Sequence, residues 1–445
     1  MPKNQQSPDI YPEIELKIDS MAFGGKGIAR HDGKVYFVED GIEGDQVLAS
    51  VTEVTDRYNE ARVKSIIKPS DFRGPSPCAV SDQCGGCQWQ GVPYGQQIVW
   101  KRHFVINALR RIGKIGEDIE VDTLPSPLTQ GYRNRIFVRA RVLRDGSVVA
   151  GYFKRSSRDF VPVSRCEIAN ERINKFLTAL KTLSLSDRLT SARVEDEVRF
   201  RFEIQDLPTM PDTSPHLLIS VYDTDQEKIP AALIANELKS IPGVLWAGPS
   251  ADLSAAPQVP FETDLGVTFH TAAGQFQQVN IQHNHTVRRL VKDTVESINP
   301  DRVLDLFCGS GNLSLPIANG IRHIDGVEFS KRAIDTAKYN VERNNLKNAH
   351  YYSGDTEKFL WRAAKQGFLY DLIIADPPRE GMFKSLIPLM KLKPKHILYV
   401  SCDPTTLSRD LGSLVKHGFS VKRFVALDFF PNTYHIESFV VLERT

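Results

Sequence analysis

The chain lacks several features that would assign it to other protein classes. It has only six cysteines in 445 residues, too few for a disulfide scaffold of this length. No apolar run approaches the roughly 20 residues that a membrane helix needs, and residues 1–6 are polar, without the apolar core of a signal segment. We see no internal repeat and no low-complexity tract. We therefore expect a cytoplasmic protein without a membrane partner, and nothing implies an obligate protein partner.

The chain also lacks a large excess of positive or negative residues, since the net charge is +2. The balance hides one local excess, because residues 101–165 carry fourteen Lys or Arg and six Asp or Glu. A concentrated basic stretch on a near-neutral chain is typical of a surface that binds a polyanion.

The length and the patterning predict three domains, at residues 1–70, 71–260 and 261–445. Short alternating segments with Gly turns over 12–68 predict a five-stranded barrel of the OB type, and a helix is expected from Tyr94 to about Gly113. Residues 125–260 look mostly β. From Phe261 onward strands alternate with helices, which predicts an α/β fold with a doubly wound parallel sheet.

A nucleotide site is expected at the carboxyl ends of the strands in this sheet. Asp305 ends one predicted strand, and Gly309 and Gly311 in the following turn let the backbone approach a ligand. Glu328 ends the next strand, where it can accept hydrogen bonds from both ribose hydroxyls of an adenosine. The turn lacks the third glycine of a pyrophosphate loop. This favours S-adenosylmethionine, which has no phosphate, over NAD.

Cys402 follows the apolar run 396–401 at a strand end, among polar turn-forming neighbours. A thiolate there can add to C6 of a uracil ring and make C5 nucleophilic toward a methyl donor. A general base must then remove the C5 proton before the thiol leaves. Glu437 is the strongest candidate for this base, and His435 is the alternative.

Another predicted strand ends in the sequence Asp-Pro-Pro-Arg, which begins at Asp376. Amino-group methyltransferases stack the target base on an aromatic side chain at the fourth position of such a motif. Arg379 offers no aromatic face but can contact phosphate. The motif therefore weighs against adenine N6 methylation and in favour of the cysteine mechanism.

Three further cysteines fall within ten residues, and a fourth lies far downstream. Four thiolates suit structural zinc or a 4Fe–4S cluster, and the spacing alone does not choose between the two. The spacing differs from the C-x3-C-x2-C pattern of radical enzymes. The residues are Cys78, Cys84, Cys87 and Cys166.

An alternating segment in the basic stretch predicts a strand with an unusual face. Its even positions from 136 to 142 are apolar, so the odd positions would present guanidinium groups around one aromatic ring. Such a face suits phosphate contacts and base stacking, although acidic residues opposite would indicate a salt-bridged surface instead. The odd positions are Arg133, Arg135, Phe137, Arg139 and Arg141.

Together these motifs resemble the RNA uracil-5-methyltransferase family, whose members form 5-methyluridine in tRNA or large-subunit rRNA. The resemblance covers nearly the whole chain. It implies that residues 12–68 form a TRAM domain, an OB-like RNA-binding barrel. It also implies a Rossmann-like class I methyltransferase domain at the C-terminus, and a helix near 93–125 that packs on this domain. For the four cysteines it implies a 4Fe–4S cluster, with zinc as the less favoured alternative.

The resemblance also implies site residues. Cys402 matches the nucleophile and Glu437 the base, while Gln278 in the stretch 276–280 matches a cofactor contact. The remaining cofactor and active-site positions match Phe307, Asn312, Glu328, Asp355 and Asp376.

We expect an S-adenosylmethionine-dependent RNA uridine C5-methyltransferase, with 23S rRNA favoured over tRNA as the substrate. One alternative is a non-catalytic RNA-binding or folding factor on a methyltransferase scaffold. A second is an RNA cytosine-5-methyltransferase, which also uses a cysteine.

Overall fold

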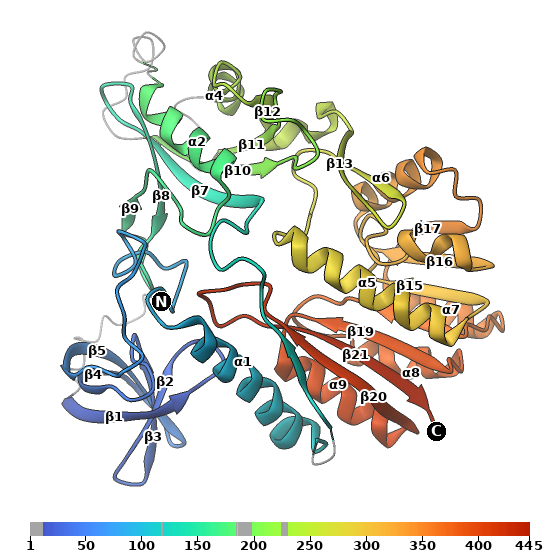
Figure 1. The fold of residues 1–445 in the computed structure, drawn as a ribbon, viewed down its shortest axis with the longest axis horizontal. Helices are drawn as coiled ribbons and strands as arrows, with labels where there is room; N and C mark the ends of the chain where they lie inside the picture. Colours follow the sequence, from blue (N-terminus) through green and yellow to red (C-terminus); the bar gives the residue numbers. More distant parts are fainter. Residues whose placement is uncertain (1–11, 117–118, 184, 186–197, 224–229) are drawn as a thin grey trace, which may run out of the picture.

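The computed structural model describes residues 12–116, 119–183, 185, 198–223 and 230–445. The polar segment 1–6, which contributed to the expected localisation, lies outside these ranges. Within them the chain forms a barrel and two large sheets, which follow one another from the blue to the red end of Figure 1. In the described ranges, no helix combines the length and apolarity that crossing a bilayer requires.

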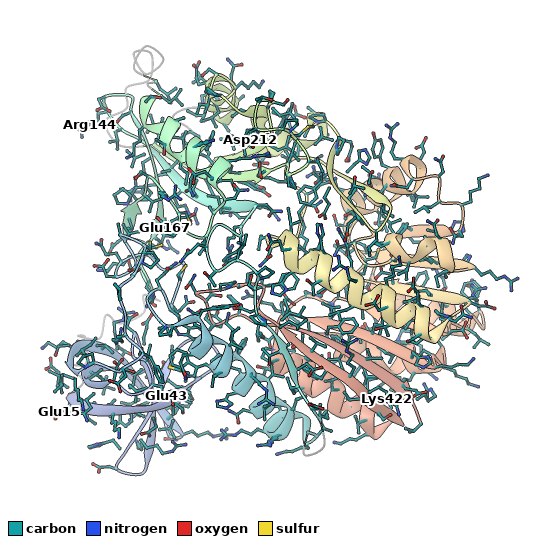
Figure 2. The ribbon with its side chains drawn as sticks, in the orientation of Figure 1. Glu15, Glu43, Arg144, Glu167, Asp212 and Lys422 are labelled. Atoms are coloured by element: carbon teal, nitrogen blue, oxygen red, sulfur yellow. The ribbon has the colours of Figure 1, made fainter. Side chains whose placement is uncertain are left out.

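The N-terminal unit is a closed five-stranded barrel with strand order β1-β2-β3-β5-β4. Closure removes the free sheet edges that would otherwise pair with other chains, and Ile18, Val38 and Val47 are buried inside. Trp100 of the following helix donates a hydrogen bond of 2.5 Å to Glu43, which Figure 2 shows on the barrel beside that helix. The strands are β1 (Glu13–Met21), β2 (Gly27–His31), β3 (Lys34–Glu39), β4 (Gln46–Val54) and β5 (Tyr58–Lys68).

The central unit is a six-stranded sheet with order β12-β11-β10-β7-β8-β9. Two helices pack on its apolar face, and Asn170 caps the first of them by accepting the N–H of Ile173. The elements are β7 (Arg135–Val142), β8 (Val148–Phe153), β9 (Phe160–Pro162), α2 (Glu171–Ala179), β10 (Val198–Asp206), β11 (Leu217–Asp223), α4 (Ala231–Leu238) and β12 (Val244–Pro249).

The segment between barrel and central sheet contributes to the C-terminal unit. Helix α1 (Tyr94–Ala108) and a π-helical turn (Leu109–Gly113) pack against helix α9 (Pro404–Lys416). Strand β6 (Asp122–Leu124) then pairs with β20 (Phe419–Leu427) at the edge of the C-terminal sheet. The region 71–125 therefore connects the barrel to the C-terminal unit before the chain enters the central sheet.

The C-terminal sheet has eight strands in the order β17-β16-β15-β18-β19-β21-β20-β6. The first five are mutually parallel, but β21 is antiparallel to both of its neighbours. The alternation of strands and helices predicts a wholly parallel sheet, and the prediction is wrong for this strand. The strands are β15 (Arg302–Leu306), β16 (His323–Glu328), β17 (Ala349–Ser353), β18 (Leu372–Ala375), β19 (His396–Ser401), β20 (Phe419–Leu427) and β21 (Glu437–Arg444). The helices are α5 (Ile281–Ile298), α6 (Lys331–Arg343), α7 (Thr356–Lys365), α8 (Leu386–Lys391) and α9 (Pro404–Lys416).

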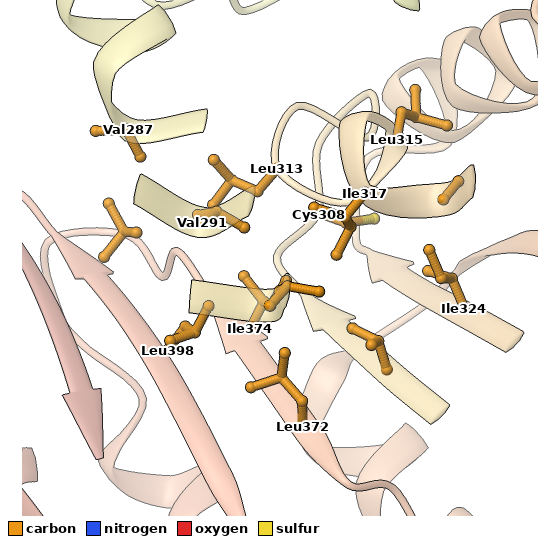
Figure 3. Packing of buried hydrophobic residues seen from close by; sticks show 14 of the residues in the cluster. Val287, Val291, Cys308, Leu313, Leu315, Ile317, Ile324, Leu372, Ile374 and Leu398 are labelled. Carbon is orange, nitrogen blue, oxygen red and sulfur yellow. The ribbon is translucent and has the colours of Figure 1, made fainter. Parts of the chain in front are cut away.

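Helices cover both faces of this sheet. Helices α5 and α6 pack on one face, and α1, α7, α8 and α9 pack on the other. Figure 3 shows Val287 and Val291 of α5 above Leu372, Ile374 and Leu398 of the strands. Each such side chain contributes roughly 1.5–3 kcal/mol on burial, so the strand ends that carry the site are held by a rigid core.

A hairpin of β13 (Val259–Asp264) and β14 (Val267–Thr271) precedes α5. The composition of residues 248–260 suggests a linker. In the structure this stretch contains the end of β12, a 3-10 helix at Ser250–Ala255 and the start of β13. It is therefore more ordered than its Pro, Ala and Ser content predicts.

Candidate active site

A cavity of about 1360 Å³ opens at the carboxyl ends of β15, β16, β18 and β19, where an open α/β sheet binds its ligands. Pockets for one small molecule are usually roughly 300–1,000 Å³, so this cavity has room for more than one ligand. The structure brings nearly all sequence-predicted cofactor and catalytic positions together here. They are Gln278, Phe307, Asn312, Glu328, Asp355, Asp376, Cys402 and Glu437, and Arg379, which was predicted to contact phosphate, lines the cavity with them.

The turn after β15 forms one wall of the cavity. Phe307 has φ of 59°, a left-handed conformation that is rare for a bulky residue and marks local strain. Gly309 and Gly311 are also left-handed, and a Cβ on Gly311 would lie 2.7 Å from the side chain of Leu315. The local geometry therefore requires glycine at 311, and the turn presents its backbone to the cavity.

Two acidic side chains at neighbouring strand ends each accept a hydrogen bond from a backbone N–H group a few residues further along the chain. Glu328 accepts the N–H of Ser330 at 2.8 Å, and Asp355 caps α7 by accepting the N–H of Lys358 at 2.9 Å. Each bond fixes one carboxyl oxygen while the residue lines the cavity. The arrangement suits two carboxylates that accept hydrogen bonds from a nucleoside.

Asn312 lines the same wall, but its amide is engaged within the protein. Its Oδ1 accepts from Arg288 at 2.6 Å and from Asn284 at 3.1 Å, and its Nδ2 donates to Asn284 at 2.9 Å. The charge of the buried Arg288 is balanced by Glu262 at 2.7 Å. This network fixes the glycine turn against α5.

Cys402 and Glu437 reach the other end of the cavity from adjacent strands. Cys402 follows β19, and Asp403 next to it caps α9 by accepting the N–H groups of Thr405 and Thr406. Glu437 is the first residue of β21, which pairs with β19 in antiparallel register. The thiol and the carboxyl group are thus placed by two different elements of one sheet.

The electrostatics of this end oppose ionisation. Burial raises the pKa of Cys402 to about 12, assisted by Glu437 and Asp376 and opposed by Arg379. Burial also raises the pKa of Asp376 to about 7 and, with Asp376, raises the pKa of Glu437 well above its usual range. Strongly shifted groups that share one cavity are typical of a reaction site.

His435 also lines the cavity, so both bases considered from the sequence lie near the thiol. Burial lowers the pKa of His435 to about 4, with contributions from the positive charge of Arg379. A neutral imidazole is able to accept a proton, so His435 and Glu437, which both line the cavity, are each chemically able to act as the base.

Sequence reasoning missed several aromatic side chains at the cavity. Phe276 and Phe329 are 71 % and 79 % exposed, and Phe383 and Phe430 also line the cavity. The first two flank Gln278 and Glu328 in sequence, and that adjacency was the available signal. Exposed rings at a cavity mouth suit stacking on a base.

The four cysteines Cys78, Cys84, Cys87 and Cys166 line a second, smaller cavity of about 210 Å³. Across the described ranges no group of three or more Cys, His, Asp or Glu side chains stands at metal-site separations, so the thiols share a cavity without forming a tight cage. Nearby donors suit thiolate ligands, because the Gly86 N–H lies 3.4 Å from the Cys84 sulfur and the Gln90 amide 3.6 Å from the Cys87 sulfur. The donor set fits a four-thiolate centre.

Strand β7 has the predicted alternation, since its even positions are buried and its odd positions are not. The odd positions differ among themselves. Arg135 forms an ion pair of 2.5 Å with Glu203 on β10, which neutralises its charge. Arg133 precedes β7 instead of belonging to it, is half-buried and lines both cavities. Arg139 lies directly opposite Arg201, which sequence reasoning did not consider.

Family comparisons agree with this geometry. A family described as tRNA (Uracil-5-)-methyltransferase matches residues 263–445, and the TRAM domain matches residues 12–64. An RNA methyltransferase of Thermosynechococcus vestitus is 32% identical over 96% of this chain and 97% of its own length. The 23S rRNA (uracil(1939)-C(5))-methyltransferase RlmD of Pseudomonas aeruginosa is 30% identical over 96% of this chain and 93% of its own.

A solved structure has the same overall fold. The tRNA (uracil-54, C5)-methyltransferase of Pyrococcus abyssi, in complex with S-adenosyl-L-homocysteine, superposes with a TM-score of 0.68. The match covers 96% of this chain and 100% of that protein at 20% identity. The barrel, the central sheet and the C-terminal sheet therefore occur together in another protein.

Proposed function

Because the chain belongs to the RNA uracil-5-methyltransferase family, we propose that it methylates C5 of one uridine in 23S rRNA through a covalent bond between Cys402 and C6. The enzyme depends on S-adenosylmethionine, which supplies the methyl group. One observation carries the mechanism. Cys402, Glu437 and Asp376 line the same cavity as the glycine turn and Glu328.

The proposed steps balance electrons and protons. The thiolate of Cys402 bonds to C6, and the C5=C6 electron pair moves into an enolate that ends on O4. C5 then takes the methyl group, and the sulfonium sulfur keeps the bonding pair as a neutral thioether. Glu437 removes the C5 proton, the C5=C6 bond re-forms, and the thiolate leaves. The target base must leave its stack to admit the thiol above the ring plane.

Two variants test the covalent step. Cys402→Ala should bind S-adenosylmethionine as wild type does but form no 5-methyluridine. Glu437→Gln should trap a covalent RNA adduct, seen as a slowly migrating band on a denaturing gel. Full turnover by Cys402→Ala would exclude the mechanism.

The choice of 23S rRNA is supported by the RlmD relative, which matches along nearly its whole length. Nucleoside mass mapping of 23S rRNA and tRNA, with and without this protein, tests the choice. Loss of 5-methyluridine from tRNA alone would reassign the substrate. Since both RNAs are modified inside the cell, the proposal places the enzyme in the cytoplasm.

We also propose that Cys78, Cys84, Cys87 and Cys166 hold a 4Fe–4S cluster. Their shared cavity and the donors to sulfur support four thiolate ligands. Iron and sulfide analysis of protein purified without oxygen tests this. Zinc in place of iron would select the structural alternative.

A basic face on the central sheet completes the proposal. Arg139 and Arg201 are opposed across β7 and β10. Like charges in direct opposition destabilise a sheet, whereas a bound phosphate backbone favours them. Phe137, which is 42 % exposed, lies 5.2 Å from the Arg201 guanidinium. We assign this face to RNA, with Arg379 contacting phosphate at the cavity.

A further inference from the structure

The loop between β20 and β21 leads directly into the proposed base. It runs from Asp428 to Ile436, and Glu437 is the next residue. In Figure 1 this red loop extends away from the sheet toward the blue segment that precedes α1. Most of its residues are buried although it contains neither helix nor strand. A buried loop needs partners for its backbone groups.

Asn432 makes more hydrogen bonds to the rest of the chain than any other residue of this loop. Its carbonyl accepts the N–H groups of Gln88 and Trp89 at 3.1 and 3.0 Å. Its N–H donates to the Gln97 side chain at 2.8 Å, and its amide donates to the Thr129 carbonyl at 2.8 Å. Gln97 also donates back to the Asn432 amide oxygen at 3.2 Å.

The backbone of Asn432 is as specific as its side chain. Its φ of 67° lies in the left-handed region, which Asn tolerates better than most residues. The residue is only 5 % exposed. A substitution therefore perturbs either the conformation or the hydrogen bonds, and the two effects can be separated.

These contacts connect the base to the cysteine centre. Gln88 follows Cys87 in the chain, so residues 78–88, the cysteine loop that carries three of the four thiols, are bonded directly to Asn432. Between Asn432 and Glu437 the side chains of Thr433 and Ile436 are 2 % and 0 % exposed. Although the two residues between them are half-buried, the packing of Thr433 and Ile436 couples a displacement of Asn432 to the position of the carboxyl group.

We propose that Asn432 is a positioning residue for Glu437, and that through it the cysteine loop determines where the base stands. This inference rests on the proposed function, in which Glu437 removes the C5 proton. Cys402 lies on a different element, between β19 and α9. Loss of the Asn432 contacts should therefore slow proton removal and thiol release while leaving adduct formation nearly intact.

The test compares Asn432→Gly with a matched control. Glycine keeps the left-handed backbone and removes only the amide. Asn345→Gly makes the same change at an exposed left-handed residue after α6. Single-turnover reactions are followed by denaturing gel, which separates free RNA from the covalent adduct, and a melting curve is recorded for each variant.

In Asn432→Gly, we expect release from the adduct to slow roughly tenfold to a hundredfold, the usual cost of a misplaced catalytic group. Adduct formation should change by less than about threefold, and the Asn345→Gly control should match wild type in both steps. Equal slowing of both steps, or unchanged release, would overturn the inference. Glu437→Gln in the same gel separates the two claims, because its failure to trap an adduct would refute the proposed function itself.

A separate experiment tests the connection between the cysteine loop and Asn432. Cys87→Ala should slow release as Asn432→Gly does, together with a loss of bound iron or zinc measured on the purified protein. Because both changes act through one path, the double variant should be no slower in release than the slower single variant. Multiplicative slowing in the double variant would show that the cysteine loop acts independently of Asn432.

Discussion

Replacing Lys101 with methionine should destabilise the C-terminal unit through the loop that precedes the base. Lys101 on α1 and Asp428 at the start of that loop are both completely buried. The ammonium group donates to the Asp428 carboxylate at 2.5 Å and to the Phe430 carbonyl at 3.0 Å. Methionine fills most of the same space but leaves the carboxylate without its counter-charge.

The size of the effect follows from the burial. Removing one partner of a buried ion pair costs about 3–5 kcal/mol, and each kcal/mol lowers the melting temperature of a domain of this size by roughly 2–4 °C. The expected decrease is therefore roughly 6–20 °C. The exposed pair between Lys422, marked in Figure 2, and Glu443 is the control, because a surface pair is worth at most about 1 kcal/mol.

Differential scanning calorimetry measures both variants against wild type. The second variant Lys101→Met/Asp428→Asn, which removes the unpaired charge, should recover part of the loss. If Lys101→Met melts within about 2 °C of Lys422→Met, the reasoning from burial is refuted. If the double variant melts lower than Lys101→Met alone, the unpaired carboxylate is not the cause.

Three further predictions follow from the site. Glu328→Gln should weaken S-adenosylmethionine binding about tenfold to a hundredfold, from a charge-assisted bond of about 1.5–3 kcal/mol; unchanged affinity by calorimetry would remove Glu328 from the ribose contact. Because burial raises the pKa of Cys402 to about 12, the thiolate fraction in the ligand-free enzyme increases about tenfold per pH unit below that value. Alkylation of Cys402, followed by mass spectrometry, should therefore rise steadily from pH 7 to 10, and a plateau near pH 8 would contradict the shift. Arg139→Ala should reduce the salt dependence of RNA binding by about one phosphate contact without changing cofactor affinity, and an unchanged slope would remove Arg139 from the RNA face.

The strand-end residues could be predicted because the alternation of strands and helices fixes their position. Glu328, Asp376 and Cys402 each follow an apolar run, and parallel strands bring their carboxyl ends to one edge. The structure places all three at one cavity. Local sequence was sufficient to identify these residues because the geometry of a parallel sheet brings strand ends together.

Pairings between distant segments could not be predicted in the same way. Arg135 and Glu203 are 68 residues apart in the chain, and only the β7–β10 register brings them together. Periodicity gives the face of a strand but not its neighbour. For the same reason, the pairing of β6 with β20 and the antiparallel direction of β21 were not foreseen.

The contacts of Asn432 show the same limit at the site itself. Gln97 and Asn432 are 335 residues apart, and nothing in either local sequence indicates that the two form hydrogen bonds. A polar residue in a loop is usually exposed, so nothing in the sequence marks this one as buried. Its role can be recognised only in the structure, where the cysteine loop, α1 and the loop between β20 and β21 meet at this residue.

Because one end of the cavity is acidic, the positive charge of the methyl donor should affect the ionisation of the groups there, in addition to supplying the methyl group. Burial raises the pKa of Cys402, Asp376 and Glu437; the charge of Asp376 further raises the pKa of the other two, and the charge of Glu437 further raises that of Cys402. A sulfonium cation in the same cavity favours ionisation of all three groups, so cofactor binding and thiolate formation are linked equilibria. We therefore expect the thiol to be least reactive when the methyl donor is absent. Such a site disfavours bonding to a uracil ring before methylation is possible.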